Sequence, residues 1–136
     1  MREQDQLFLT QLMSAHGGVA GTVHRREGEL LVISAAVNIP PPVVEVTRHI
    51  PFGKGMAGLA WQRQAPVQTC NLKDDGSGDV RPGAKAVDAA AAVALPLNDG
   101  SGVVRAVVGV AFAEVGELPP ERVQALWDDA RTLPPG

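Results

Sequence analysis

The chain has 136 residues, the usual size of one folded domain, and 45% of them are hydrophobic. The single cysteine excludes an internal disulfide. The net charge of −3 argues against nonspecific binding to nucleic acid, which requires a basic surface. The N-terminus has no signal-peptide pattern, and the longest apolar stretch, residues 89–97, is too short to span a bilayer. We expect a single domain over residues 1–136 that lies in the cytoplasm and binds neither membranes nor nucleic acid.

The first predicted element is a helix over residues 2–15, ended by Gly17 and Gly18. Asp5 lies near its start, where a carboxylate suits the helix dipole. The apolar residues of this segment recur at helical spacing and form one stripe. They are Leu7, Phe8, Leu12 and Met13. The stripe must be buried, either against the domain's own sheet or against a second copy of the same helix.

A β-hairpin is predicted next. Residues 19–26 alternate in polarity as a strand does, and residues 30–37 form the return strand. Gly28 between them supplies the positive φ that a tight turn needs. We interpret the adjacent cations Arg25 and Arg26 as the solvated end of the first strand.

Three prolines at residues 40–42 predict a stiff extended loop, because proline disrupts both helix interiors and paired strands. Residues 43–50 alternate again and predict a third strand. A glycine-rich link at residues 51–58 then leads into a helix over residues 56–64. Residues 66–70 form a short strand.

The next segment, residues 71–83, is polar and glycine-rich, which predicts a loop, and residues 84–89 form a helical turn. Residues 91–97 are continuously apolar, as expected of a strand buried on both faces. The turn sequence at residues 98–102 connects this strand to a long one over residues 103–113.

The last predicted element is a helix that opens at Pro119, because proline is tolerated in a first turn. Its apolar face consists of Val123, Leu126, Trp127 and Ala130. The complete order predicts an α+β fold with a mostly antiparallel sheet of five or six strands. The terminal helices would cover one face, and the small helix and polar loop would form a lid on the other.

Six segments in this order and spacing resemble the GAF domain family of sensory and regulatory modules. They are residues 20–24, 30–36, 50–58, 65–72, 92–97 and 107–110. The resemblance implies a GAF-like sheet, related to PAS and profilin folds, with a pocket between the sheet and residues 71–89. Family members hold cyclic nucleotides, bilins, haem, small acids or nothing there, so the resemblance implies a site without naming its ligand.

The glycine run of Gly53, Gly55 and Gly58 has two interpretations. Glycines let backbone N–H groups approach a phosphate, but this spacing fits neither the dinucleotide-binding fingerprint nor the P-loop. We favour the other interpretation, in which the glycines permit a tight turn and close packing of a helix on the sheet.

One branch of the GAF family reduces free methionine sulfoxide with cysteine thiols. The resemblance to that branch implies one thiol at the start of the internal helix, where this chain has Ala57, and another in residues 79–88, which contain no cysteine. Cys70 has no resolving partner. We therefore expect no enzymatic activity and no catalytic residue, and methionine sulfoxide reduction is the least favoured alternative.

Other cofactor chemistry is also disfavoured. Cys70 is more typical of a small core residue than of a chromophore-attachment or oxidation site. His16, His24 and His49 are scattered over three elements, and we interpret the latter two as solvent-facing rather than as haem or metal ligands. The polar residues 71–75 lack the phenylalanine and the acidic pair that should follow in a cyclic-nucleotide site. We expect no cofactor and no metal.

The candidate ligand-binding residues lie around the implied pocket. Arg81 and Lys85 could pair with a small carboxylate or phosphate. The full candidate set is Met56, Cys70, Asp79, Arg81, Lys85 and Asp88.

The expected function is sensory or regulatory, with an unidentified small molecule or a signalling protein as partner in signal transduction. The alternative is a dimerisation scaffold whose pocket is filled by the alanines of residues 89–94. Free-standing GAF domains often form homodimers, so the terminal helices supply the candidate interface. Its residues are Leu7, Phe8, Leu12, Met13, Val123, Leu126 and Trp127.

Overall fold

The computed structural model describes residues 1–69, 90–114 and 116–135. Its elements, in chain order, are α1 (Glu3–His16), β1 (Ala20–Glu27), β2 (Leu30–Val37), α2 (Pro41–Val46), β3 (His49–Pro51), α3 (Gly55–Arg63), β4 (Val67–Thr69), β5 (Ala91–Asn98), β6 (Val104–Phe112) and α4 (Pro120–Ala130).

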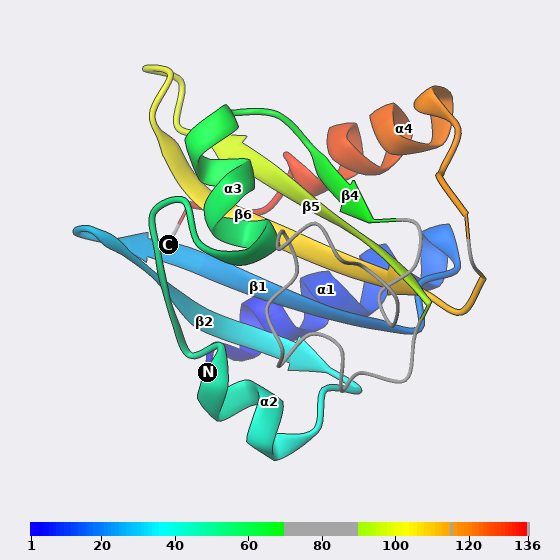
Figure 1. The fold of residues 1–136 in the computed structure, drawn as a ribbon, viewed down its shortest axis with the longest axis horizontal. Helices are drawn as coiled ribbons and strands as arrows, with labels where there is room; N and C mark the ends of the chain where they lie inside the picture. The colour runs from blue at the N-terminus through cyan, green and yellow to red at the C-terminus, as the bar shows by residue number, and fades with distance from the viewer. Residues whose placement is uncertain (70–89, 115, 136) are drawn as a thin grey trace.

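The strands form one sheet in the order β3-β2-β1-β6-β5-β4, and each neighbouring pair is antiparallel. Helices α1 and α4 cover one face of the sheet, while α2 and α3 lie on the opposite face (Figure 1). The predicted α+β fold, with terminal helices on one face and an internal helix on the other, is confirmed.

The prediction for the proline segment was wrong. Residues 41–46 form the helix α2 rather than an extended loop and a strand, and of the predicted third strand only residues 49 and 50 belong to β3. Proline suits the first helical positions because its missing N–H would have no partner there. The carbonyl of Pro40 accepts hydrogen bonds from the amides of Val43 and Val44, and thus starts the helix.

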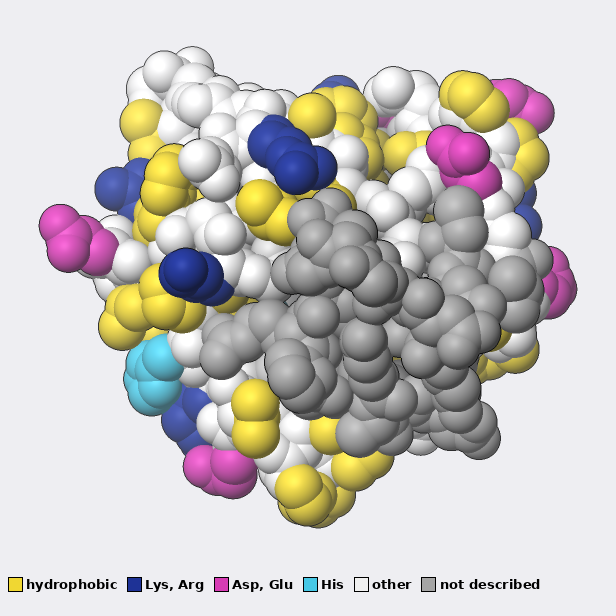
Figure 2. All heavy atoms as spheres, in the orientation of Figure 1, with side chains coloured by type: hydrophobic (Ala, Val, Ile, Leu, Met, Phe, Trp, Pro, Cys, Tyr) yellow, Lys and Arg dark blue, Asp and Glu magenta, His cyan; other side chains and the backbone are white. Residues whose placement is uncertain are grey.

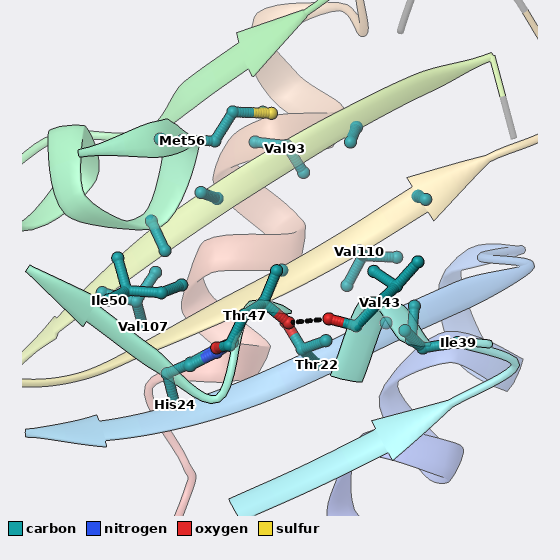
Figure 3. A pocket seen from close by; sticks show the side chains of 17 residues that line it. Thr22, His24, Ile39, Val43, Thr47, Ile50, Met56, Val93, Val107 and Val110 are labelled. Carbon is teal, nitrogen blue, oxygen red and sulfur yellow. Dashed lines mark hydrogen bonds between the residues drawn. The ribbon is translucent and has the colours of Figure 1, made fainter. Parts of the chain in front are cut away.

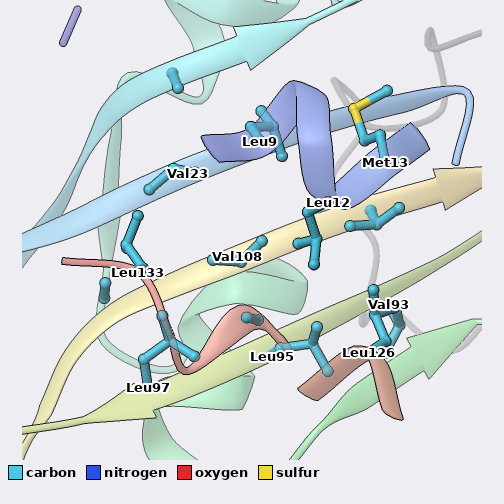
Figure 4. Packing of buried hydrophobic residues seen from close by; sticks show 14 of the residues in the cluster. Leu9, Leu12, Met13, Val23, Val93, Leu95, Leu97, Val108, Leu126 and Leu133 are labelled. Carbon is cyan, nitrogen blue, oxygen red and sulfur yellow. The ribbon is translucent and has the colours of Figure 1, made fainter. Parts of the chain in front are cut away.

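The main core lies between the sheet and the two terminal helices (Figure 4). Leu9, Leu12 and Met13 of α1 and Leu126 of α4 are buried there. They meet large side chains from the three central strands, among which are Val23, Val93, Leu95, Val108 and Val110. Of the predicted apolar stripe, Leu12 and Met13 are buried against the domain's own sheet and Phe8 is partly buried there, whereas Leu7 is exposed. Leu9, outside the predicted stripe, is fully buried.

A buried ion pair fastens α1 to the sheet. The Nε and Nη2 atoms of Arg25 donate to the two carboxylate oxygens of Asp5, each at 2.7 Å. Ser34 Oγ also donates to Asp5 at 2.7 Å, and Arg25 Nη2 donates to the carbonyl of Pro134 at 2.8 Å. The interpretation of Arg25 as a solvated strand end was wrong, since its side chain is buried; Arg26 is exposed as expected.

Burial alone would raise the pKa of Asp5, but the hydrogen bonds from Arg25 and Ser34 outweigh it and hold that pKa below its ordinary value. Ser34 reaches the carboxylate because β2 has an irregularity there. Val23 faces Ala35 while His24 faces Ile33, so Ser34 is an extra residue in the ladder.

Replacing Asp5 with alanine should lower the free energy of unfolding by about 3–5 kcal/mol, because Arg25 would be left buried without its counter-ion. Urea denaturation measures the change. The matched control is Asp128→Ala, which removes an exposed ion pair with Arg131 and should cost no more than about 1 kcal/mol. Equal losses in the two variants would contradict the prediction.

Candidate functional site

A cavity of about 130 Å³ lies between the sheet and the helices α2 and α3. Its floor is formed by β1, β5 and β6, and its other walls come from β3, from α3 and from the region of α2 (Figure 3). This is the side of the sheet on which the sequence placed a ligand pocket.

Small side chains on the sheet leave the space open. Ala92 and Ala94 of β5 and Gly109 of β6 line the cavity, whereas their neighbours Leu95 and Val108 contribute to the main core on the other face. Gly109 pairs with Thr22, and a Cβ at Gly109 would lie 3.2 Å from Thr22 Oγ1. Residues with larger side chains at these positions would fill the cavity.

The glycine-rich link brings α3 to the cavity edge. Gly53 and Gly55 have positive φ values of 78° and 65°, which favour glycine. A Cβ at Gly58 would lie only 2.6 Å from the carbonyl oxygen of Pro51, so only glycine allows this approach. The favoured interpretation of a tight turn with close helix packing is confirmed, and it positions Met56 on the cavity wall.

His24 is the buried polar residue of the wall. Its side chain projects from β1, and its Nε2 lies 2.8 Å from the carbonyl oxygen of Thr47, just after α2. Burial lowers the pKa of His24 to about 4, although the hydrogen bond to Thr47 acts in the opposite direction. The interpretation of His24 as solvent-facing was wrong, whereas His49 is exposed as expected.

The sequence does contain a pattern that indicates which face of the sheet His24 lies on. Thr22 and His24 alternate with Val23 along β1, so they share the face opposite to the main core. Sequence reasoning took this polar face for the solvent side. The structure places it under α2, where it lines a cavity.

Among the described residues that line the cavity, Thr22, His24 and Thr47 have polar side chains and none has a charged one. Thr47 Oγ1 donates to the carbonyl of Val43 at 2.8 Å (Figure 3). On the described part of the face in Figure 2, acidic and basic side chains are scattered among hydrophobic ones. The described part of the site suits an uncharged, largely apolar molecule.

Of the candidate ligand-binding residues, Met56 lies on the cavity wall. The other five, Cys70, Asp79, Arg81, Lys85 and Asp88, lie outside the described residues. Within the described ranges, no group of three or more histidine, aspartate or glutamate side chains is placed to hold a metal ion. Nor is any helix there long and apolar enough to cross a membrane.

The candidate interface residues divide into three groups. Leu12, Met13 and Leu126 are buried in the chain's own core and cannot face a partner. Three others are partly buried against the same core: Phe8, Val123 and Trp127. Leu7 is 59% exposed. The homodimer stays a prediction, and of these residues Leu7 is the one most available to it.

Solved structures with the same fold cover nearly the whole chain. A type II free methionine-R-sulfoxide reductase from Thermoplasma acidophilum has a TM-score of 0.77 at 15% identity, over 95% of this chain and 86% of its own. The GAF domain of a phosphoenolpyruvate-protein phosphotransferase from Acinetobacter has a TM-score of 0.76 at 14% identity, over 96% and 78%. The second GAF domain of DevS from Mycobacterium smegmatis has a TM-score of 0.68 at 21% identity, over 93% and 85%. No family sequence profile and no curated protein sequence matches the chain.

The similar structures include both GAF domains of larger proteins and enzymes. Besides the Thermoplasma protein, free methionine-R-sulfoxide reductases from Neisseria meningitidis and Staphylococcus aureus share the fold. This finding contradicts the prediction that the chain has no enzymatic activity. That prediction was wrong because it relied on the absence of expected thiols, whereas the fold itself supports catalysis in several neighbours.

The buried neutral His24 should make stability depend on pH. Because its pKa is about 4 in the folded state and near 6.5 when unfolded, the unfolded chain binds more protons between these values. The free energy of unfolding should therefore fall by roughly 2 kcal/mol between pH 7 and pH 5. Urea denaturation across this range measures the slope.

The comparison that tests this assignment uses two histidine variants. His24→Leu should lose most of the slope, while His49→Leu, at an exposed position, should keep it. An unchanged slope in His24→Leu would show that other groups cause the pH dependence.

Proposed function

Since the chain has a GAF fold, we propose that it binds a small, largely apolar molecule in the cavity between the sheet and the helices α2 and α3. The observation that supports the proposal is the cavity itself, whose walls are formed mostly by alanine, valine, isoleucine and glycine. Ligand sites are typically concave and apolar with a few placed polar groups, and this cavity has that composition.

The volume limits the size of the ligand. An apolar cavity of about 150 Å³ is known to take up benzene, so a cavity of about 130 Å³ suits a molecule of similar size. The uncharged described wall gives no counter-ion to a phosphate or carboxylate, so a neutral molecule fits best.

The position of the cavity supports a regulatory role. A ligand there would contact the sheet and two helices at once, because Thr22, Val43 and Met56 come from three different elements around it. Binding would stabilise the arrangement of these elements relative to one another. We propose that the domain reports the ligand to a signalling partner, as is consistent with its resemblance to the GAF family of regulatory modules and with the GAF domains among its structural neighbours.

Reduction of free methionine-R-sulfoxide is a second candidate, favoured by the three reductases among the similar structures. Reducing a sulfoxide takes two electrons, which thiols supply by forming a disulfide. The chain has Cys70 as its one cysteine, so the second thiol would come from another molecule. If this candidate holds, the protein with added dithiothreitol reduces the free sulfoxide, and Cys70→Ser abolishes the reaction.

Filling the cavity should abolish binding of a small apolar probe. With toluene as the probe, the wild-type melting temperature should rise in a saturable way, because binding adds about 2.7 kcal/mol of stability at 100 times the dissociation constant. The variant Ala92→Leu, which places a larger side chain on the cavity wall, should lose this response.

The matched control is Ala125→Leu, the same substitution at an exposed position of α4. It should keep the toluene response of the wild-type protein. A similar response in Ala92→Leu would mean that toluene binds elsewhere, and the proposed site would be wrong.

A further inference from the structure

Thr22 carries an unpaired hydroxyl on the floor of the cavity. The residue lies on β1 and is partly buried. Unlike the hydroxyl of Thr47, which donates to the carbonyl of Val43, Thr22 Oγ1 makes no hydrogen bond within the described residues. Two side-chain atoms there are both unpaired and inaccessible to solvent, His24 Nδ1 and Arg105 Nη1, and Thr22 Oγ1 is not one of them. The hydroxyl of Thr22 therefore has accessible surface and no partner in that part of the chain.

The space over Gly109 shows where this hydroxyl points. Gly109 of β6 pairs with Thr22, so side chains at the two positions share a face of the sheet. Apart from Gly109 and its two chain neighbours, only two heavy atoms lie within 4 Å of a Cβ built on Gly109. They are Thr22 Oγ1 at 3.2 Å and the carbonyl oxygen of Val93 at 4.0 Å, so the methyl carbon of Thr22 is farther away. The hydroxyl, rather than the methyl group, borders this space.

We call this space the Gly109 notch. Gly109, Thr22 and Val93 all line the cavity, so the notch is a recess in the cavity floor that two oxygens border. Apolar side chains lie to either side of Thr22, with Ile50 on one side and Val110 on the other (Figure 3). The floor thus combines one small polar recess with an apolar surround.

The two oxygens determine which chemical group suits the notch. The carbonyl oxygen of Val93 can only accept a hydrogen bond, whereas the hydroxyl of Thr22 can donate or accept. A hydroxyl group on the ligand matches both, because it also donates and accepts. A purely apolar ligand would cover the hydroxyl of Thr22 and leave it unpaired, which costs free energy. A charged group would find no counter-ion on the described wall.

Resting on the proposed function, we propose that Thr22 Oγ1 forms a hydrogen bond with a hydroxyl group of the bound molecule, which is therefore a small neutral alcohol or phenol with an apolar body. Phenol represents this class, and toluene has nearly the same shape without the hydroxyl. Since only phenol replaces the water that the hydroxyl of Thr22 loses, Thr22 selects between the two.

The test compares the two probes in wild-type protein and in Thr22→Val. Valine has nearly the shape of threonine, with a methyl group in place of the hydroxyl, and its branched side chain suits a strand. Isothermal titration gives the dissociation constants of phenol and toluene for each protein. The ratio of toluene to phenol dissociation constants should fall about five- to tenfold in Thr22→Val, because only phenol loses a hydrogen bond.

Two control variants separate the hydroxyl from packing. Thr22→Ser keeps the hydroxyl and should keep the wild-type ratio. Thr10→Val makes the same substitution at an exposed position of α1, on the opposite face of the sheet, and should also leave the ratio unchanged. An equal fall in Thr22→Ser and Thr22→Val would contradict a role for the hydroxyl.

A second measurement does not depend on whether the variants fold. A crystal structure of the wild-type protein with phenol should place the phenol oxygen about 3 Å from Thr22 Oγ1. Phenol bound in the cavity with its oxygen directed away from the Gly109 notch would overturn the inference.

The outcomes distinguish this inference from the proposed function. If both probes bind and Thr22→Val keeps the wild-type ratio, the role of Thr22 is wrong and the proposed binding site stands. If neither probe binds to the wild-type protein, the proposed function fails and the inference fails with it.

Discussion

The structure depends on an unequal distribution of side-chain volume between the two faces of its sheet. Along β5 and β6, the residues that face α1 and α4 are large, as Leu95 and Val108 show, whereas Ala94 and Gly109 face the opposite side. Interiors pack at nearly constant density, so large residues make a solid core and small ones need a cover that comes close. Where α2 and α3 do not fill the remaining space, the cavity is left.

The face of the sheet that α1 and α4 cover is stabilised by more than apolar contacts. Asp5 and Arg25 form a buried, two-point ion pair, and Ser34 and the carbonyl of Pro134 occupy further hydrogen-bonding positions of the pair. Buried charges are tolerated only when they are paired so fully. The pair joins α1, β1, β2 and the segment after α4, so four parts of the chain are fastened together on this face, while the opposite face contains the cavity.

The sequence predicted most of the fold, because helical and strand periodicities are local signals. It failed at Pro41, where the same residues suit a loop or the first turn of a helix, and the surrounding contacts decide. It also failed for Arg25 and His24, since alternation shows which residues share a face and does not show what covers that face. Met56 lies on the cavity wall as the sequence suggested, whereas the cavity floor, made of alanine and glycine, has no chemical signature in the sequence.

The extra residue in β2 has a consequence for how this chain tolerates change in length. Leu31 packs on the α3 side and Ala35 on the α1 side, although residues four apart in a regular strand would share a face. Ser34 provides the shift between them. Deleting Ser34 would leave a regular ladder, because Val23 would still face Ala35 and His24 would still face Ile33. The deletion would instead remove the hydroxyl that donates to the buried carboxylate of Asp5. A chain one residue shorter at this point should therefore keep both faces of the sheet and lose one hydrogen bond to the buried ion pair.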